Sequence, residues 1–338
     1  MKLLIITQKV DRDDPILGFF HRWIAEFSKR CEHVTVIGQE IGTYELPSNV
    51  HVLSLRKEKK WPRFIQILRF WILIVRHRHA YDVVLVHMTP IWVALGWKFW
   101  FVLRKQIYLW YEARGGRWPL RIASLCVRKV FSASKRGMPI RTRKSVVVGH
   151  GIDIDRFVPG ETPRDATLFV TVGRITAAKR LPILLHVLAA LEEPYHIVIV
   201  GVPVTAADRS VDAGLRDLIR RLHLERRVVM QAMSHEDLPS LLQRATLFLH
   251  ASETALDKAV LEAMACGCVV ISCANAVQSV LPETLRASPE QMARVVQWFC
   301  SLPKPEQDDL RQALRAAVTE HHSLSRLIER LCEEMSPL

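Results

Sequence analysis

The sequence lacks the features of several classes of protein. Its 338 residues contain no apolar run close to the roughly 20 residues that a membrane-spanning helix requires. The seven cysteines are odd in number and form no C-x-x-C pair, a pattern that fits neither a disulfide framework nor a zinc site. The apolar run from Leu3 to Ile6 is typical of a buried first strand and is too short for a signal peptide. We therefore expect a reduced protein of the cytoplasm without a membrane span.

Positive charge and tryptophan are concentrated in one part of the chain, residues 51–144, called the basic stretch below. It holds 21 Lys or Arg residues and three acidic residues, a net charge of +18, whereas the whole chain carries +13. It also holds seven of the nine tryptophans. Basic residues interleaved with aromatic ones suit an anionic membrane surface. Nucleic acid would suit the charge equally well.

One segment of the basic stretch, residues 61–79, predicts an almost wholly apolar helix. Gln66, Arg69 and Arg76 fall on a single stripe of it. Two interpretations remain open. The helix is either a core helix with polar ends, or it lies in a bilayer surface with Arg69, Trp71 and Arg76 facing the membrane.

Short β-branched runs alternate with helical patterns along the whole chain. We expect buried strands at residues 2–8, 33–38, 50–55, 81–87, 106–113 and 145–151, and again at 167–174, 196–201, 227–232, 246–252 and 268–272. Such alternation implies parallel sheets covered on both faces, and this many strands are better divided between two sheets.

The predicted fold is therefore α/β, with two doubly wound Rossmann-like lobes that face each other across a cleft. A segment rich in Gly, Pro and charge, 149–165, marks the joint between the lobes. We assign residues 1–150 to the first lobe and 151–320 to the second. Helical periodicity from residue 289 onward predicts C-terminal helices, of which the last, 321–338, is expected to pack on the first lobe.

Two cations follow a strand of the second lobe. The strand ends at Gly173, and Arg174 and Lys179 lie in the loop that opens the next helix. Two cations at the carboxyl edge of a parallel strand can neutralise a diphosphate that gains charge as it leaves. Either residue alone would be interpreted as a solvated loop residue.

A later helix, residues 256–267, offers a second set of charged groups. Lys258 and Glu262 are four residues apart and share a face. The helix start exposes unpaired amides that suit a phosphate. Taken alone, the two residues are explained equally well as a surface pair worth a few tenths of a kcal/mol.

Four segments, in their order and spacing, resemble the second lobe of glycosyltransferase family 4, a retaining group with the GT-B fold. They are HGIDIDRF, VGRITAAK, SHEDLPSLLQRATLFLHAS and LEAMACGCVVIS. The resemblance covers most of 145–275 and, more loosely, the first lobe. It implies that Arg174 and Lys179 contact the diphosphate of a nucleotide sugar beside Gly173, and that Glu262 binds the ribose. It also implies that Gly18 lets the backbone approach the phosphates.

The chain departs from the family's paired-glutamate motif at its first position. Eight residues before Glu262 stands Thr254, and Glu253 is one place off. Three alternatives remain: the loop bulges so that Glu253 reaches the donor sugar, Asp257 and Thr254 share this role, or contact with the sugar is weakened. Asp257 and Lys258 lie close to the helix start in every case.

A histidine that relatives often carry after the fifth strand of the first lobe is also missing. Its place is taken by Glu112, which we expect to face the cleft as a catalytic and acceptor-binding residue, or else to pair with Arg114 or Arg117. His87, at the end of the strand 81–87, is a second candidate for the acceptor, or it caps local backbone. His235 is interpreted as structural.

These features predict a retaining glycosyltransferase that moves a sugar from a UDP-sugar or GDP-mannose to a hydroxyl acceptor. The family resemblance favours a lipid-linked saccharide or a cell-surface polysaccharide as acceptor, at the inner face of the cell membrane. We expect no metal or other cofactor, because Arg174 and Lys179 supply the charge. The alternatives are a catalytically silent nucleotide-sugar scaffold and, less favoured, a basic nucleic-acid binder.

Overall fold

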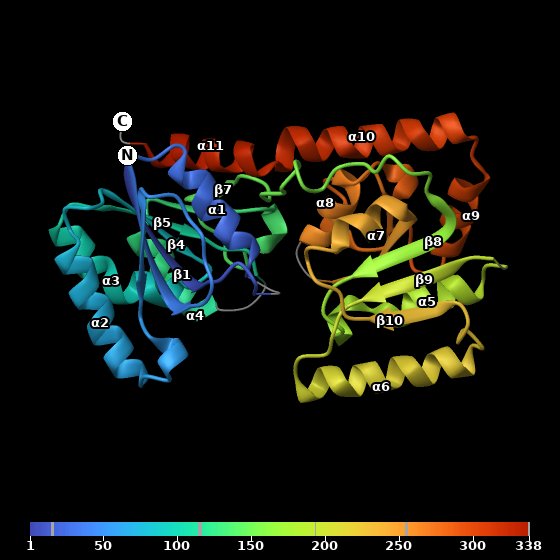
Figure 1. Ribbon diagram of the computed structural model, residues 1–338, viewed down its shortest axis with the longest axis horizontal. Coiled ribbons are helices and arrows are strands. Elements are labelled where there is room, and N and C mark those ends of the chain that lie inside the picture. The colour runs from blue at the N-terminus through green and yellow to red at the C-terminus, as the bar shows by residue number, and fades with distance from the viewer. Residues whose placement is uncertain (15–16, 114–116, 193, 254–255, 337–338) are drawn as a thin grey trace. The chain divides into compact units, whose positions relative to one another are not determined.

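The computed structural model describes residues 1–14, 17–113, 117–192, 194–253 and 256–336. The chain divides into two compact units, each built on one parallel sheet (Figure 1). The first unit is Met1–Gly151 with Leu324–Leu338, and the second is Ile152–Ser323. The expected α/β fold with two parallel sheets is confirmed. Within the described residues, no helix combines the length and the apolar character needed to cross a bilayer.

The first unit contains a seven-stranded sheet in the order β3-β2-β1-β4-β5-β6-β7, in which every pair of neighbours is parallel. The strand order reverses between β1 and β4. The strands are β1 Lys2–Val10, β2 His33–Ile41, β3 Val50–Ser54, β4 Val83–His87, β5 Gln106–Trp110, β6 Lys129–Ser132 and β7 Ser145–Val147.

Helices cover both faces of this sheet. Leu3 and Ile5 of β1 pack on α1 (Phe19–Ser28) and α11 (Leu324–Met335). Their neighbours on β1, Leu4 and Ile6, point to the opposite face, because successive side chains of a strand alternate. That face is covered by α2 (Arg63–Arg76), α3 (Pro90–Val102) and α4 (Arg117–Cys126). Two 3₁₀ turns, η1 (Lys57–Lys59) and η2 (Lys135–Gly137), complete the first unit.

The second unit contains a five-stranded parallel sheet in the order β10-β9-β8-β11-β12. Its strands are β8 Asp165–Val172, β9 His196–Val200, β10 Val228–Gln231, β11 Ala245–His250 and β12 Val269–Ser272. Its helices and 3₁₀ turns are η3 Ala177–Lys179, α5 Leu181–Ala189, α6 Ala206–Arg221, α7 Leu238–Arg244, α8 Lys258–Ala265, η4 Asn275–Val277, η5 Glu283–Leu285, α9 Met292–Ser301 and α10 Lys304–His322.

The strand order of this second sheet reverses between β8 and β11. Helices α7, α8 and α10 lie on one face of the sheet, while α5 and α6 lie on the other (Figure 1). Open parallel sheets bind ligands outside the carboxyl ends of the strands where the order reverses. The loops that follow β8 and β11 are therefore the place in the second unit where a ligand is expected.

The sequence missed one strand of the first sheet, β6. It spans only Lys129–Ser132 and follows α4, which ends at Cys126, after two residues. Four residues are too few to show a period. The helical C-terminal region is confirmed, since α9, α10 and α11 occupy most of it.

Candidate functional site

The first cation of the expected site, Lys179, is held by a carboxylate from another loop. Its Nζ donates a hydrogen bond of 2.6 Å to Oδ2 of Asp257, the residue before α8. Nε2 of His250, at the end of β11, lies 2.9 Å from the same oxygen, and Nδ1 of His250 lies 2.9 Å from Oγ of Ser272. The loops after β8 and β11 thus meet through one chain of polar contacts.

These contacts decide the charge of Asp257. Burial raises the pKa of its carboxyl, but the hydrogen bond to His250 and the charge of Lys179 outweigh burial and hold the pKa well below its usual range. Asp257 is therefore an anion that neutralises Lys179 in the protein without ligand.

The second cation, Arg174, also has an acidic partner. Its Nε and Nη2 donate to Asp208 of α6 over 2.9 and 3.3 Å. Oδ2 of Asp208 accepts from the backbone amides of Val204 and Thr205 as well, within a capping box at the start of α6. These backbone hydrogen bonds, followed by the Arg174 contact, hold the pKa of Asp208 well below its usual range despite desolvation. The guanidinium is half-exposed and fixed in direction.

Two glycines make room for this arrangement. Gly173 has φ +146°, and a β-carbon there would lie 2.8 Å from Cε of Lys179. Gly201, directly after β9, leaves even less room for a side chain, because a β-carbon there would lie 2.0 Å from the carbonyl oxygen of Gly173. Gly201 was not among the predicted site residues. Its position at the end of a buried strand, in register with the Gly173 loop, was the available signal.

Glu262 is nearly buried on α8, and Oε1 lies 3.1 Å from Nε2 of His235. His235 follows β10 and was interpreted as structural, yet it contacts a proposed ligand residue. Lys258, one turn before Glu262, is half-buried. Burial lowers the pKa of Lys258 to about 7, with the charge of Glu262 acting in the opposite direction. His250 was not predicted either, although a histidine that ends a buried strand is a recognisable signal.

Two of the three candidates for the role of the first glutamate, Glu253 and Asp257, belong to the residues that the structure describes. Thr254 lies outside the described residues. Glu253 is 60% exposed and pairs with Arg180 over 3.2 Å, so its carboxylate is directed toward the junction of η3 and α5. Asp257 lies nearer the cations than Glu253 does, since it contacts Lys179 directly. The role of each in sugar binding remains a prediction.

Three expected site residues belong to the first unit. Gly18 begins α1 with φ −55°, and its missing side chain admits the carbonyl oxygens of Arg12 and Asp14, to which a β-carbon would lie 2.7 and 2.6 Å. His87 is 2% exposed, stacks on Phe20 at 3.9 Å between ring centroids, and lies 3.3 Å from Oγ1 of Thr7. The structure therefore places His87 in an aromatic core, where it does not offer a surface to an acceptor.

Glu112 is the third of the expected donor and acceptor residues that belong to the first unit. Its carboxylate accepts hydrogen bonds from the amides of Ala133 and Ser134, at 2.7 and 3.2 Å, and from Oγ of Ser134 at 2.8 Å. Burial raises the pKa of Glu112, partly offset by these hydrogen bonds. Gly137 covers the carboxylate so closely that a β-carbon there would lie 1.9 Å from Cδ of Glu112. The side chain thus ties β5 to the loop after β6. Arg114 and the side chain of Arg117, its alternative partners, lie outside the described part of the chain.

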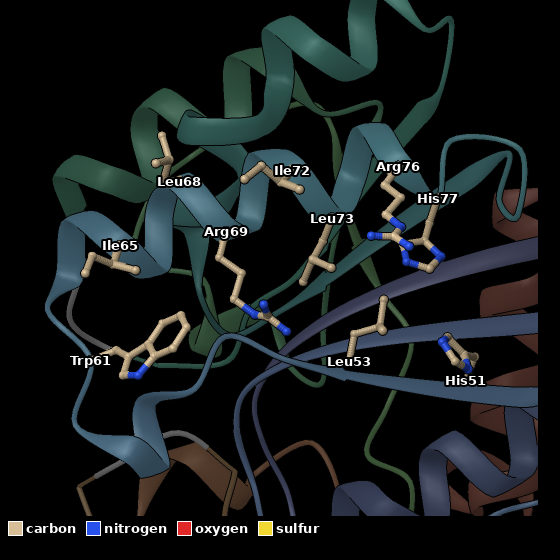
Figure 2. A pocket seen from close by; sticks show the side chains of 10 residues that line it. All are labelled: His51, Leu53, Trp61, Ile65, Leu68, Arg69, Ile72, Leu73, Arg76 and His77. Carbon is tan, nitrogen blue, oxygen red and sulfur yellow. The ribbon is translucent and has the colours of Figure 1, made fainter.

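The expectation that Trp71 faces a membrane is wrong. Its Nε1 donates to the carbonyl of Leu95 over 2.9 Å, and its ring packs against Phe99, so the indole lies between α2 and α3. Arg69 and Arg76 line a groove between α2 and β3 (Figure 2). Arg69 donates from Nε to the carbonyl of Ser54 over 2.7 Å and is therefore directed toward the strand.

Among the residues that the structure describes, no three His, Cys, Asp or Glu side chains gather in a way that could hold a metal ion.

The sequence profile described as Glycosyl transferases group 1 matches residues 154–329. No curated protein sequence matches the chain significantly. The fold is similar to that of HepE from Anabaena in complex with UDP, at 18% identity and a TM-score of 0.81 over 100% of both chains.

Two further structures share the fold. Sucrose-phosphate synthase from Thermosynechococcus elongatus superposes at 16% identity and a TM-score of 0.78 over 98% of both chains. A glycosyltransferase from Rickettsia africae superposes at 16% identity and a TM-score of 0.77, over 99% of this chain and 98% of that one. At such identities the likeness establishes the fold alone.

Proposed function

The chain belongs to the group 1 glycosyltransferases, whose profile matches more than half of it, and we propose that it is a retaining enzyme acting on a nucleotide-sugar donor. The donor is a UDP-sugar or GDP-mannose, and the acceptor is a hydroxyl group. One observation carries this proposal. Arg174 and Lys179 follow β8 at the reversal of strand order, and Lys179 is joined to the residue that precedes α8.

The acidic partners leave both cations able to bind a diphosphate. Lys179 has three N–H donors and gives one to Asp257, while Arg174 has five and gives two to Asp208. The carboxylates hold two long side chains in place, so less freedom is lost when phosphate binds. The remaining donors are available to oxygens on which negative charge develops.

The proposed transfer needs few protein groups. The bond between the anomeric carbon and the phosphate oxygen breaks, and the acceptor oxygen bonds to the same face of that carbon. The acceptor proton passes to an oxygen of the departing diphosphate. Positioning and charge stabilisation by Arg174 and Lys179 then supply most of the rate, and no metal or other cofactor is invoked.

The remaining donor contacts are assigned to α8 and the loop before it. Glu262, steadied by His235, is proposed to accept hydrogen bonds from the ribose hydroxyls. Gly173 gives backbone access to the phosphates, and Asp257 and Lys258 stand beside the sugar and the phosphates. HepE has been crystallised with UDP and with UDP-glucose, which favours a UDP-sugar over GDP-mannose.

The acceptor is assigned to the first unit, and we propose a lipid-linked saccharide or a growing cell-surface polysaccharide. The charge of the basic stretch supports this choice, because such acceptors lie at an anionic membrane surface. The enzyme would then work in the cytoplasm at the inner face of the membrane.

Thermal unfolding of the full chain with UDP, GDP and their sugars tests the proposal. A ligand present at 100 times its dissociation constant stabilises the fold by about 2.7 kcal/mol. Arg174→Ala and Glu262→Ala should abolish the shift, whereas Arg216→Ala, which removes an exposed arginine paired with Asp212 on α6, should keep it. A flat response to every nucleotide would overturn the proposal.

A catalytically silent nucleotide-sugar scaffold is the second candidate. It is favoured by the neutralisation of Lys179 by Asp257 and by the pairing of Glu253 with Arg180. A scaffold predicts the thermal shift without release of sugar from the donor. Slow donor hydrolysis that disappears in Arg174→Ala would exclude it.

A further inference from the structure

A groove runs along the edge of the first unit, between β3 and α2 (Figure 2). It has a volume of about 480 Å³, within the range of small-molecule sites. Its apolar part consists of Leu53 from β3 with Ile65 and Leu73 from α2, and Trp61 lies at one end. A hydrocarbon chain is the kind of group that such a surface buries.

The polar part of the groove is entirely basic. Arg69 reaches from α2 toward β3, while Arg76 lies beside His77 at the end away from Trp61, and His51 projects from β3 (Figure 2). None of the residues lining the groove is acidic. In the described part of the chain, neither arginine lies within ion-pair distance of a carboxylate.

Burial and neighbouring positive charges act together on the basic groups of this cluster. Burial lowers the pKa of His77, and the charges of His51, Arg76 and His33 lower it further. Burial also lowers the pKa of Arg69, and the charge of Arg56 adds to the effect, with Glu58 opposing it. Arg69 uses Nε to donate to Ser54, so its two terminal NH₂ groups are further donors that an anion in the groove can accept from.

The outer face of α2 continues this site as an apolar surface. Phe64, Leu68 and Ile72, which follow one another at intervals of four residues, are 70%, 55% and 57% exposed. Leu68 and Ile72 also line the groove. Further exposed apolar residues occur on α3, which packs against α2, and on α4, which packs against α3, among them Phe101 and Leu125.

We propose that this groove binds the headgroup phosphate and one acyl chain of an anionic phospholipid, with α2 lying in the surface of the bilayer. The phosphate is held by Arg69 and Arg76, and the acyl chain lies on the apolar side. A free phosphate would have no use for the apolar side, and a nucleic acid would leave Phe64, Leu68 and Ile72 exposed to water. The site is independent of the proposed sugar transfer, since its residues bind no donor.

Flotation of the full chain with vesicles tests this site. The chain should float with vesicles of phosphatidylglycerol and phosphatidylcholine and remain unbound with phosphatidylcholine alone. The double variant Arg69→Gln, Arg76→Gln should weaken vesicle binding by about 30-fold. Each basic residue near the membrane surface raises the affinity about fivefold, and two are removed. Leu68→Ser with Ile72→Ser, which keeps every charge, should weaken it by about tenfold or more.

The matched control removes the same charge elsewhere. Arg216→Gln with Arg220→Gln on α6 lowers the net charge equally and should leave vesicle binding within about twofold. If this control variant weakens vesicle binding as much as Arg69→Gln with Arg76→Gln does, net charge alone explains the loss of binding and the proposed site is wrong. The lipid site would also be wrong if the chain does not bind vesicles but binds an oligonucleotide, and Leu68→Ser with Ile72→Ser does not weaken that binding. It would be wrong as well if inorganic phosphate stabilises the chain and vesicles do not bind.

The nucleotide response separates the two proposals. Both groove variants should keep the thermal shift with UDP, which also shows that they are folded. Vesicle binding without a nucleotide shift would refute the donor site alone, and the reverse result would refute the lipid site alone.

Discussion

The ammonium nitrogen of Lys179 lies 2.6 Å from Oδ2 of Asp257, and the same oxygen contacts His250. The proposed phosphate ligand is thus neutralised before any donor arrives. A diphosphate that approaches Lys179 gains a hydrogen bond from a cation and is repelled by the neighbouring carboxylate. Donor affinity therefore depends on a competition between two anions for one ammonium group.

Asp257→Asn should tighten the binding of UDP by about tenfold, because it removes the like charge and keeps an oxygen that accepts from Lys179. Lys179→Ala should weaken binding. Isothermal titration at low ionic strength measures both, and Asp212→Asn on α6 is the control for a lost surface carboxylate. Weaker binding in Asp257→Asn would show that the carboxylate mainly positions Lys179.

The same carboxylate should make the fold sensitive to acid. Although burial raises the pKa of Asp257, His250 and Lys179 lower it below the value of an unfolded aspartate, about 3.9. The stability that Asp257 contributes is therefore fully present above that value and is lost as the pH falls toward the folded pKa. Urea unfolding between about pH 5 and pH 3 should show a smaller loss in Asp257→Asn than in the wild type. Parallel pH profiles would contradict the assignment.

Lys258 gives the proposed donor site a proton-linked signature. Burial lowers its pKa to about 7, so part of the population is neutral at pH 7.5. A bound diphosphate beside Lys258 raises that pKa, and the complex takes up a proton. At pH 7.5 the heat of UDP binding should therefore differ between Tris and HEPES, whose ionisation enthalpies differ. Lys258→Met should remove the difference, and an undiminished difference would assign the proton elsewhere.

Local pattern is sufficient to predict much of this fold. The alternating apolar runs predicted the parallel sheets, and the predicted end of the strand now labelled β8 indicated that Arg174 and Lys179 lie in the loop after it. The partners of these cations were not predictable in the same way. Asp208 lies in a later helix, and its contact with Arg174 depends on how the fold brings the start of α6 to the loop after β8. His250 and Asp257 are seven residues apart, but only the course of the loop between them brings their side chains together.

The sequence also did not predict which side of helix α2 faces the rest of the protein. For α2, one interpretation directed the polar stripe with Arg69 toward a bilayer and the other made α2 a core helix. Arg69 faces β3, and apolar residues such as Leu68 are exposed. The polar and apolar residues of α2 follow a clear helical period, but the polar stripe lies toward β3, so the period alone does not show which side of the helix faces the core. The position of Trp71 was predicted wrongly because its hydrogen-bond partner, Leu95, belongs to another helix, α3, whose packing against α2 the sequence does not show.

Glu112 should prove to be a positioning residue of the first unit. Glu112→Ala removes the oxygen that accepts from the backbone amides of Ala133 and Ser134. The free energy of unfolding should fall by about 1–3 kcal/mol, the cost of buried donors without an acceptor. Urea unfolding measures this, and the thermal shift with UDP should persist. Unchanged stability with loss of sugar transfer would instead make Glu112 a catalytic residue.

A glycine pair in the second unit tests whether the Gly173 loop must keep its shape. A β-carbon at Gly201 would lie 2.0 Å from the carbonyl oxygen of Gly173, so Gly201→Ala must push that loop and the adjoining Arg174 out of place. UDP binding should fall by at least about tenfold. The control is Gly214→Ala, in the middle of α6, where a β-carbon meets nothing within 4 Å. Alanine there should stabilise the fold by about 0.5–1 kcal/mol and leave UDP binding unchanged, because it favours the helix without touching the site. If Gly201→Ala binds UDP as the wild type does, the donor phosphates do not depend on the loop after β8.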